Sequence, residues 1–394
     1  MGAFFRAIFV FVLVVSMAAP ANAKRRRHSH PSPSPSAHKR TDAEIEAATR
    51  LQVFLDRANF SPGKIDGHYN DFTLKALTLY RQSRGEPVPE VRSQRSEDRN
   101  QGSEDRSQKP EVRGGKGPNQ RQSAKPDSAP DLNGIDLGSV NPVFVQYTVT
   151  DADLKNIGPV PPGSGGAQVA AQKAKLPALP YSNVGEEIAE KFHADQKFLG
   201  ELNPGKNGAA LRPGDQVRVP NVEPFEVEAV KDLKPGSELT AEIANEMPDQ
   251  SAEESPAPAA TASVKVDVKS NMLGVFEGDR IVAAYPVTIG SQRTQTPIGE
   301  WKVRGVVKLP TFRYDEQMLN RGQRSGKFYI LRPGPNNPVG VIWIALNKRG
   351  IGIHGTDEPD TIGKETSHGC IRLANWDIVR LAARVKAGVP VSVH

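Results

Sequence analysis

One long stretch of this 394-residue sequence contains no aromatic side chain, and it divides the chain. Residues 84–135 are rich in Arg, Ser, Gln, Gly and Pro, and the tetrapeptide SEDR occurs in them twice. Such a segment offers too little apolar surface to offset the entropy lost on ordering. We therefore predict a disordered linker over 84–139. A second stretch rich in Pro and Ala, at 248–262, predicts another linker, drawn over 224–262.

The first 23 residues have the pattern of an export signal. Arg6 is their only charged residue, a mostly apolar run follows it, and Ala-Asn-Ala ends at Ala23. This order of charge, apolar run and small residues is typical of signal peptides, and the run is short for a bilayer span of about 20 residues. The sequence predicts a signal peptide over 1–23 and a periplasmic or cell-envelope location. An uncleaved membrane anchor is the alternative.

A basic segment follows the predicted cleavage point. Residues 24–40 carry six Lys or Arg and no acidic residue, with Ser and Pro alternating between them. This composition favours an extended, unpacked chain, so we predict a solvated tether. Attraction to an anionic envelope polymer or membrane face is the alternative. Nucleic acid is not expected as a partner, because the chain is predicted to be exported and contains no recognisable nucleic-acid-binding motif.

Residues 41–83 predict a small α-helical domain. Apolar residues recur at helical spacing before and after the turn-rich segment GKIDGHYND: Leu51, Phe54, Leu55, Ala58, Leu74, Leu77 and Tyr80. The pattern resembles the small helical peptidoglycan-binding domain found beside cell-wall enzymes, although Asn70 stands where that family usually has glycine. The resemblance implies binding to the wall. A generic helical hairpin is the alternative.

Residues 140–223 predict a strand, two short helices and a final strand. The segments are FVQYTVTDADL, VGEEIAEKFHADQKFLGELNP and LRPGDQVRVP, read from their periodicity and turns. The end of this region resembles a LysM domain, an α+β fold that holds N-acetylglucosamine polymers, and this implies binding to glycan strands. An insertion at about 157–180 departs from the compact pattern of that family. His193 is interpreted as a surface or packing residue.

Residues 263–394 predict one compact, mainly β domain. Val264, Val266 and Val268 alternate in its first strand, and EGDR predicts a hairpin. Further short strands follow, then a helix capped by Asn375, and the strand VPVSV. The helix is predicted to bury an apolar stripe and to stop at a glycine: Ile378, Leu381, Ala382, Val385 and Gly388.

The only cysteine of the chain lies in the motif SHGC. Cys370 has no partner for an internal disulfide, so it is a free or intermolecular thiol, or simply a small buried hydrophobe. A thiol attacks carbonyl groups as thiolate, and a nearby imidazole both accepts its proton and lowers its pKa. His368 and His354 both qualify by position. Gly369 lets backbone amides converge on an oxyanion beside the nucleophile.

The segment IHGTDEPDTIGKETSHGCIRLANWD resembles the signature of L,D-transpeptidases with a YkuD-type catalytic domain, and TPIGEWKV and PGPNNPVG match two more of its segments. Together they span nearly all of 263–394. The resemblance implies a mainly β catalytic fold that cross-links peptidoglycan stem peptides through a thioester, with no cofactor and no metal. It assigns Cys370 as nucleophile and His354 as general base. It also implies acylation of Cys370 by carbapenems.

The same resemblance assigns the residues that shape the site and the oxyanion hole: Ser367, His368, Gly369 and Gly355. In some members a serine follows the base histidine and orients it. Gly355 holds that position here, so only a backbone carbonyl could serve. Arg372 suits a substrate carboxylate or, equally, a structural salt bridge to Asp377. The two tryptophans nearest the site are interpreted as core residues: Trp343 and Trp376.

Two other classes of protein compete with this interpretation. A zinc enzyme could use His354, His368 and Cys370 as ligands, and a non-catalytic scaffold could bind the wall through its two binding regions. Within the enzyme class the acyl acceptor stays open. It is a stem-peptide amine, water (a carboxypeptidase), or a lysine of an envelope lipoprotein. The predicted modularity further implies that 263–394 folds and acts alone.

Overall fold

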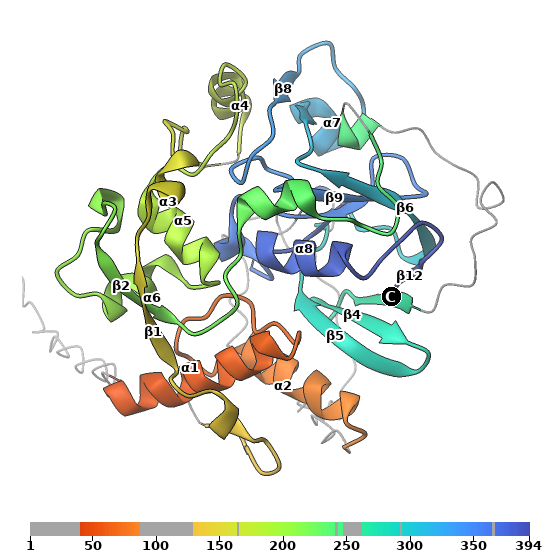
Figure 1. Cartoon of the computed structure of the whole chain (residues 1–394). Coiled ribbons are helices and arrows are strands. Elements are labelled where there is room, and N and C mark those ends of the chain that lie inside the picture. The colour runs from red at the N-terminus through yellow and green to blue at the C-terminus, as the bar shows by residue number, and fades with distance from the viewer. Residues whose placement is uncertain are drawn as a thin grey trace, which may run out of the picture. The chain divides into compact units, whose positions relative to one another are not determined.

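The computed structural model describes residues 40–86, 129–163, 165–240, 243–246, 262–291, 294–364 and 367–394. The predicted signal peptide, nearly all of the tether, most of the first predicted linker and the later part of the second lie outside these residues. Residues from Thr41 onward belong to one compact unit (Figure 1). Within the described segments, no helix combines the length and the apolar character that crossing a membrane requires.

A mixed sheet of eight strands forms the centre of the C-terminal region, in the order β11-β10-β9-β6-β12-β3-β4-β5. Two neighbouring pairs are parallel, β10 with β11 and β12 with β3, and the other pairs are antiparallel. The mainly β fold predicted for this region is confirmed. The strands are β3 (Ala262–Asp267), β4 (Met272–Glu277), β5 (Arg280–Pro286), β6 (Gly299–Lys308), β9 (Ile342–Leu346), β10 (Gly352–His354), β11 (Ile371–Arg372) and β12 (Pro390–Val393).

Both faces of the sheet are covered around β9, whose five residues are all buried. Ile342 and Ile344 pack into the main core with helix α8 (Asn375–Ala382), which lies against the sheet in Figure 1. Trp343 and Ala345 point to the opposite face, because side chains alternate along a strand, and they belong to a second core. That second face is covered by β7 (Phe312–Tyr314), α7 (Glu316–Arg321) and β8 (Tyr329–Leu331).

The start of α8 differs from the prediction. Ala374, not Asn375, is the N-cap residue, and it has no side chain that could accept a hydrogen bond. The Asn375 side chain accepts from the Val341 amide at 3.1 Å and donates to the Glu190 carboxylate at 2.9 Å. The buried Asn375 amide group thus forms hydrogen bonds between segments, and leaving such a group unpaired would cost free energy. Ile378, Leu381 and Ala382 are buried as predicted, but the helix ends at Ala382, before Val385 and the predicted stop at Gly388. Val385 is buried beyond the helix.

The two helices predicted in 41–83 are present as α1 (Asp42–Arg57) and α2 (Asp71–Ser83). Thr41 and Glu44 form a capping box at the start of α1, and the Asn70 side chain caps α2 by accepting from the Thr73 amide. Leu74 was predicted on the buried face but is 38% exposed. The apolar faces of both helices pack against strands β4 and β5 rather than only against each other.

The strand–helix–helix–strand order predicted for 140–223 is also present. Strands β1 and β2 pair in antiparallel fashion, and α5 and α6 pack beside them around one core. The insertion contains a further helix, α4. The elements of this region are β1 (Phe144–Thr148), α3 (Asp151–Lys155), α4 (Ala167–Lys173), α5 (Val184–Lys191), α6 (Gln196–Leu202), η2 (Gly208–Ala210) and β2 (Gln216–Pro220). Short helices outside it are η1 (Leu137–Ser139), η3 (Val227–Asp232), η4 (Ala244–Glu246) and, in the C-terminal region, η5 (Pro359–Thr361).

The described parts of the predicted linkers are packed, not free. Phe225, Val227 and Val230, from the segment predicted as 224–262, are buried in the main core. Leu239 donates its amide to Val306 of β6 at 2.8 Å. The predicted linker packs because it contains apolar residues between its prolines. Burial of their side chains stabilises the contact of this segment with the sheet. The segment predicted as a linker thus holds residues that pack on the C-terminal region, and the predicted domain boundaries stay a prediction.

A buried polar cluster joins the helical region, the second region and α8. The Asp56 carboxylate accepts from both terminal nitrogens of Arg380, at 3.0 and 2.9 Å, and lies 3.0 Å from His193 Nδ1. Burial raises the pKa of Asp56, but Arg380 and His193 outweigh it and hold this pKa well below its usual range. The His193 ring is 1% exposed and stacks on Trp376. His193 is thus a packing residue, as predicted, and not a surface one.

Candidate active site

The register of β10 and β11 brings the predicted nucleophile and base to one face of the sheet. These strands are parallel, with Ile353 opposite Ile371 and His354 opposite Arg372. Both isoleucines enter the main core, so His354 and Arg372 face the other side. Cys370 precedes Arg372 by two and packs against the second core, which contains Trp343. His354 lies directly opposite Trp343 across β9 and β10 and belongs to the same face.

His354 is held in one orientation and one tautomer. Its ring is 4% exposed and stacks on Trp343, with centroids 5.2 Å apart and planes 7° apart. Its Nδ1 lies 2.6 Å from the Gly355 carbonyl oxygen. A carbonyl only accepts, so Nδ1 carries the proton and Nε2 keeps its lone pair. The sequence allowed only a backbone carbonyl in this orienting position, and that is the group found there.

Burial acts against the charged form of each group of the predicted pair. It raises the pKa of the Cys370 thiol to about 11, although the Gly352 backbone and Arg372 act in the opposite direction. It lowers the pKa of His354 to about 3, against the bond to Gly355. The thiol donates to the Gly350 carbonyl at 3.4 Å. Desolvation thus disfavours both charged forms, and the lowering of the thiol pKa by the imidazole stays a prediction.

A serine hydroxyl organises the turn that precedes the thiol. Ser367 Oγ donates to the Cys370 carbonyl and accepts from the Gly369 amide at 3.2 Å. Gly369 has φ +110°, a conformation that side chains rarely adopt. The Gly369 amide is thus occupied in shaping the turn. Ser367 itself is fixed to the Ile289 carbonyl through its amide, at 2.8 Å.

The turn after His354 has no room for a side chain. A Cβ on Gly355 would lie 2.2 Å from Asn375 Oδ1 and 3.1 Å from Gly340 Cα. Gly355 therefore serves twice, through its carbonyl and through its small size. Asn375 and Gly340 were not predicted to support the site. The only signal for Gly340 was its place at the end of PGPNNPVG.

The remaining predicted residues lie near the site in different environments. His368 is exposed. The Asp377 carboxylate accepts from the Ser61 hydroxyl at 2.8 Å and lies 3.8 Å from Arg380. The two roles considered for Arg372 both stay predictions. Trp343 and Trp376 are each 2% exposed, so both are core residues, as predicted.

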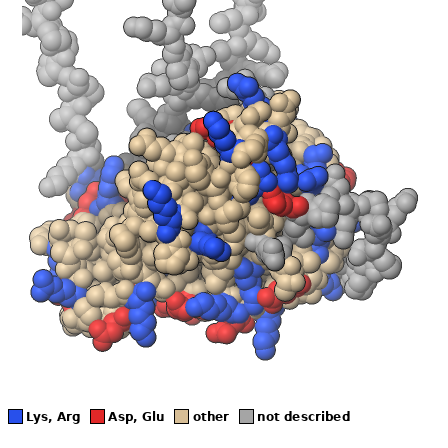
Figure 2. All heavy atoms as spheres, turned by 90° about the horizontal axis from the view of Figure 1, so that it is seen from above, with Lys and Arg blue, Asp and Glu red and all other residues tan. Residues whose placement is uncertain are grey.

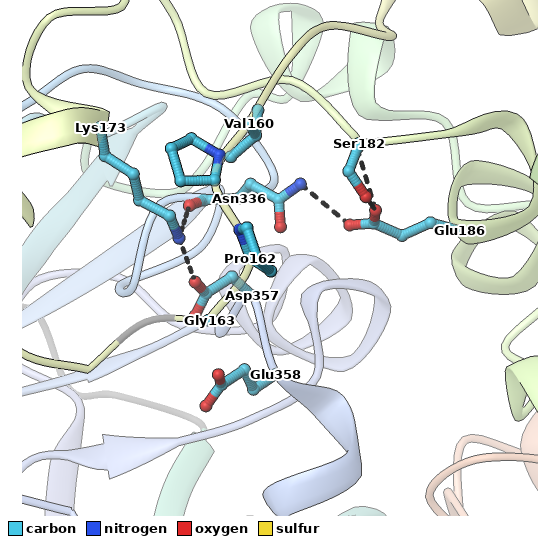
Figure 3. A pocket seen from close by; sticks show the side chains of 10 residues that line it. Val160, Pro162, Gly163, Lys173, Ser182, Glu186, Asn336, Asp357 and Glu358 are labelled. Atoms are coloured by element: carbon cyan, nitrogen blue, oxygen red, sulfur yellow. Dashed lines mark hydrogen bonds and ion pairs between the residues drawn. The ribbon is translucent and has the colours of Figure 1, made fainter. Parts of the chain in front are cut away.

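A polar recess of about 190 Å³ opens where the insertion of the second region meets two loops of the C-terminal region. Figure 3 shows Lys173 and Asp357 paired on one side of it and Asn336 with Glu186 on the other. Asp357 is the third residue after His354 in the chain. This recess was not predicted, because its two halves are far apart in sequence.

The surface offers further information about charge. On the face in Figure 2, Lys and Arg side chains stand mostly apart from one another on a largely neutral surface, and acidic side chains gather along one rim.

Among the described residues, no group of three or more His, Cys, Asp or Glu side chains is arranged to hold a metal ion. The zinc alternative therefore has no ligand set in that part of the chain.

Comparison with known proteins identifies the class of this domain. Residues 261–393 match the family model of the L,D-transpeptidase catalytic domain, YkuD. The chain is 30% identical over 135 residues to L,D-transpeptidase YqjB of Bacillus subtilis, which covers 33% of this chain and 69% of that protein. It is 29% identical over 208 residues to L,D-transpeptidase YkuD of Bacillus licheniformis, covering 53% of this chain and 92% of that protein. The chain belongs to the L,D-transpeptidase family.

Solved structures give similar matches at lower identity. The catalytic domain of the Enterococcus faecium L,D-transpeptidase is 22% identical, with a TM-score of 0.28, and the match covers 35% of this chain and all of that one. L,D-transpeptidase 3 from Mycobacterium tuberculosis, in complex with a faropenem-derived adduct, is 18% identical, also with a TM-score of 0.28. That match covers 34% of this chain and 60% of the other.

Proposed function

We propose that the protein is an exported cysteine L,D-transpeptidase that acts on peptidoglycan stem peptides through a thioester acyl-enzyme. One observation carries the proposal. In a domain of this family, the only cysteine and a buried histidine of fixed tautomer share one face of adjacent strands. A histidine whose Nε2 keeps its lone pair, on the same face of the sheet as a thiol, supplies the base that nucleophilic catalysis by that thiol requires.

In the first half-reaction Cys370 Sγ attacks the carbonyl carbon of the donor peptide bond while His354 Nε2 takes the thiol proton. In this scheme proton transfer from sulfur to the imidazole accompanies the attack. The C–N bond then breaks, and the leaving amine takes the proton from the imidazolium. The product is a thioester on Cys370.

In the second half-reaction an acceptor amine attacks the thioester. Its proton passes to His354, the C–S bond breaks, and the thiol recovers the proton. A side-chain amine of a second stem peptide gives a cross-link, and a lysine of an envelope lipoprotein gives wall attachment. Water as acceptor would make the protein an L,D-carboxypeptidase, which is the second candidate function on the same site.

The other regions are proposed to hold the enzyme at its substrate. Residues 41–83 act as a peptidoglycan-binding-like domain, and 140–223 act as a LysM-like domain on glycan strands. The signal peptide over 1–23 and the basic tether over 24–40 place the chain in the periplasm or at the cell envelope. Carbapenems, whose strained carbonyl is open to a thiol, are proposed to acylate Cys370.

The proposal is tested with the purified mature chain and a soluble tetrapeptide donor. Intact-protein mass spectrometry should detect an acyl adduct, and peptide mapping should locate it on Cys370. Muropeptides from a deletion strain then identify the acceptor: fewer three–three cross-links indicate an amine, fewer tripeptides indicate water, and less wall-bound protein indicates a lipoprotein. An adduct on another residue, or no adduct with any donor or carbapenem, would contradict the proposal.

A further inference from the structure

A buried ion pair ties the insertion of the second region to the loop that follows His354. Lys173 is the last residue of α4, and its Nζ donates to the Asp357 carboxylate at 2.9 Å and to the Asn336 carbonyl at 3.1 Å. The two charged side chains are 2% and 3% exposed. Figure 3 shows the ammonium group between these two acceptors. One lysine thus holds two loops of the C-terminal region at once.

Both of these loops border the turn that orients the base. Asp357 is separated from His354 by Gly355 and Thr356 only. Asn336 lies in the loop 333–340, at whose end a Cβ on Gly340 would lie 2.6 Å from the Gly355 carbonyl carbon. The Gly355 carbonyl is the acceptor of His354 Nδ1. A displacement of either loop would therefore move the group that fixes the tautomer of His354.

The loop 333–340 is shaped to receive this insertion. The Leu179 amide donates to the Pro333 carbonyl at 2.9 Å, and the Asn336 amide donates to the Leu179 carbonyl at 3.0 Å. Gly334 has φ +146°, and a Cβ there would lie 2.1 Å from the Leu179 oxygen. The backbone of the second region approaches this loop so closely that only glycine fits. The contact is thus built into the C-terminal region as well.

A buried ion pair is a poor source of net stability, because desolvation of the two charges cancels much of their attraction. Its stronger effect is on geometry, since the lysine satisfies both acceptors only when both loops are in place. Burial raises the pKa of Asp357 to about 6 in spite of Lys173. Loss of the ammonium group would leave a carboxylate that neutralises or turns to water, and the loop would move with it.

We propose that Lys173 is a positioning residue of the active site, which acts through Asp357 and Asn336 on the turn that orients His354. This inference rests on the proposed function of the Cys370 site. It makes the insertion, the part of the second region that departs from the compact LysM pattern, a component of the catalytic machinery. The second region then serves the chemistry as well as retention on the wall.

The chain offers a matched control for this test. Lys191 pairs with Asp153 inside the second region, with side chains 4% and 0% exposed. Lys191 also contacts Glu187 and Glu226, each at 3.2 Å, and none of these partners adjoins the loop 333–340 in sequence. Lys173→Met removes the partner of one buried acid, and Lys191→Met removes the shared partner of three acids. Lys191→Met is therefore expected to lose at least as much stability, but only Lys173 is linked to the turn after His354.

The experiment uses the mature chain and measures kcat and KM on a soluble stem peptide, the rate of Cys370 alkylation by iodoacetamide at fixed pH, and Tm. We expect Lys173→Met to lower kcat by about 10- to 100-fold, the range caused by small misplacements of reacting groups. Its KM should change by less than about threefold, and alkylation should slow in parallel. Lys191→Met should lower Tm at least as much as Lys173→Met while kcat and alkylation stay within about twofold.

Two further variants complete the test. Lys173→Arg keeps the charge and should recover part of the lost kcat, and Asp357→Asn should act in the same direction as Lys173→Met. The double variant should be no worse than the worse single one, because the two residues act through one contact. If Lys173→Met does not fold, Asp357→Asn decides by itself.

Unchanged kcat in the folded Lys173 or Asp357 variants would overturn the inference, as would equal losses in Lys173→Met and Lys191→Met. Alkylation needs no peptidoglycan, so it separates this inference from the proposed function. If the wild type fails on every stem peptide, the proposed function is wrong. Slower alkylation in Lys173→Met but not in Lys191→Met would even then support the positioning role.

Discussion

Two buried histidines in this protein each stack on a tryptophan, yet their surroundings differ. His354 stacks on Trp343 at 5.2 Å and 7°, and His193 stacks on Trp376 at 5.1 Å and 14°. Their rings are 4% and 1% exposed. The Nδ1 of His354 faces a neutral carbonyl, whereas that of His193 faces the Asp56 carboxylate, which is already paired with a guanidinium group.

This difference indicates that burial and stacking do not make a histidine a base. A carbonyl fixes the tautomer without adding charge, and the free nitrogen faces a side of the sheet that holds a thiol. The carboxylate next to His193 is instead one member of a cluster that fastens three regions together. The partner of Nδ1 and the residue on the neighbouring strand, not the stack, distinguish the two roles.

The largest effect is expected at the thiol. Cys370→Ser should lower turnover by at least about 10³-fold, because a hydroxyl is far less acidic and the base is matched to sulfur. The change is close to isosteric, so Tm should shift by only a few degrees. Steady-state turnover and differential scanning calorimetry measure the two effects. Residual turnover within tenfold of the wild type would show that another residue is the nucleophile.

The next effect separates the two stacks. His354→Ala should lower kcat by about 10²- to 10⁴-fold, the usual contribution of a general base, while the protein stays folded. His193→Ala should do the reverse, with kcat within about twofold and a loss of about 1–3 kcal/mol in the free energy of unfolding. Urea unfolding and turnover on the same preparations compare them. A His193 variant that is stable but inactive would remove the distinction drawn here.

The SHGC motif is a local signal, so the sequence alone pointed to a site around Cys370. The choice of His354 as its base came from the resemblance to L,D-transpeptidases, because position alone did not separate His354 from His368. Alternating apolar residues predicted the strands, and helical spacing predicted the buried stripe of α8. The effect of burial on the pKa values of Cys370 and His354 was not predictable, because it depends on segments that no spacing rule connects.

The contacts between regions were the main omission. Phe60 bridges to Ala284, Ser61 donates to Asp377, and Lys173 pairs with Asp357 across 184 positions. Linker composition suggested independent modules, and it does not report on surfaces that meet in space. Shared cores between α1, α2 and strands β4 and β5 argue that 263–394 alone is less stable than the modular prediction implies.

The pH dependence of Cys370 alkylation distinguishes two resting states of the Cys370–His354 pair. The sequence predicts a thiolate and an imidazolium ion, whereas burial in the structure favours the neutral forms. If burial dominates, the rate of Cys370 alkylation should rise with an apparent pKa well above the ordinary value of about 8.5, toward about 11. A thiolate–imidazolium pair would instead give a limb well below that value. Iodoacetamide kinetics between pH 5 and 11 should be compared with those of His354→Ala. A limb near pH 6 in the wild type would rule out the neutral pair.

Both buried histidines should lower the free energy of unfolding in acid. The pKa of His354, about 3, and the lowered pKa of His193 lie below the ordinary value, so the unfolded state binds these protons more readily. Stability present above about pH 6.5 is therefore lost as the pH falls. His354→Phe and His193→Phe should each reduce the slope by up to about 1.4 kcal/mol per pH unit. Unchanged slopes in urea titrations would show that these rings are protonated in the folded state.

The smallest effect is expected at Arg372. If it binds a substrate carboxylate, Arg372→Lys should raise KM by about 3- to 10-fold, because a lysine cannot make the bidentate contact. kcat should change little. A substrate analogue with that carboxylate amidated should show the same KM with both proteins. Loss of stability with no change in KM would favour the structural salt bridge instead.

The position of β12 in the sheet has a consequence for the order of folding. This strand follows every other strand in the chain, yet it lies between β6 and β3 and pairs with both. The four strands β11, β10, β9 and β6 therefore join β3, β4 and β5 only through residues 390–393. Pairings this distant in sequence form slowly. A chain emerging from the ribosome or a translocation pore cannot close its sheet until this late segment is out, and it stays open for most of its synthesis.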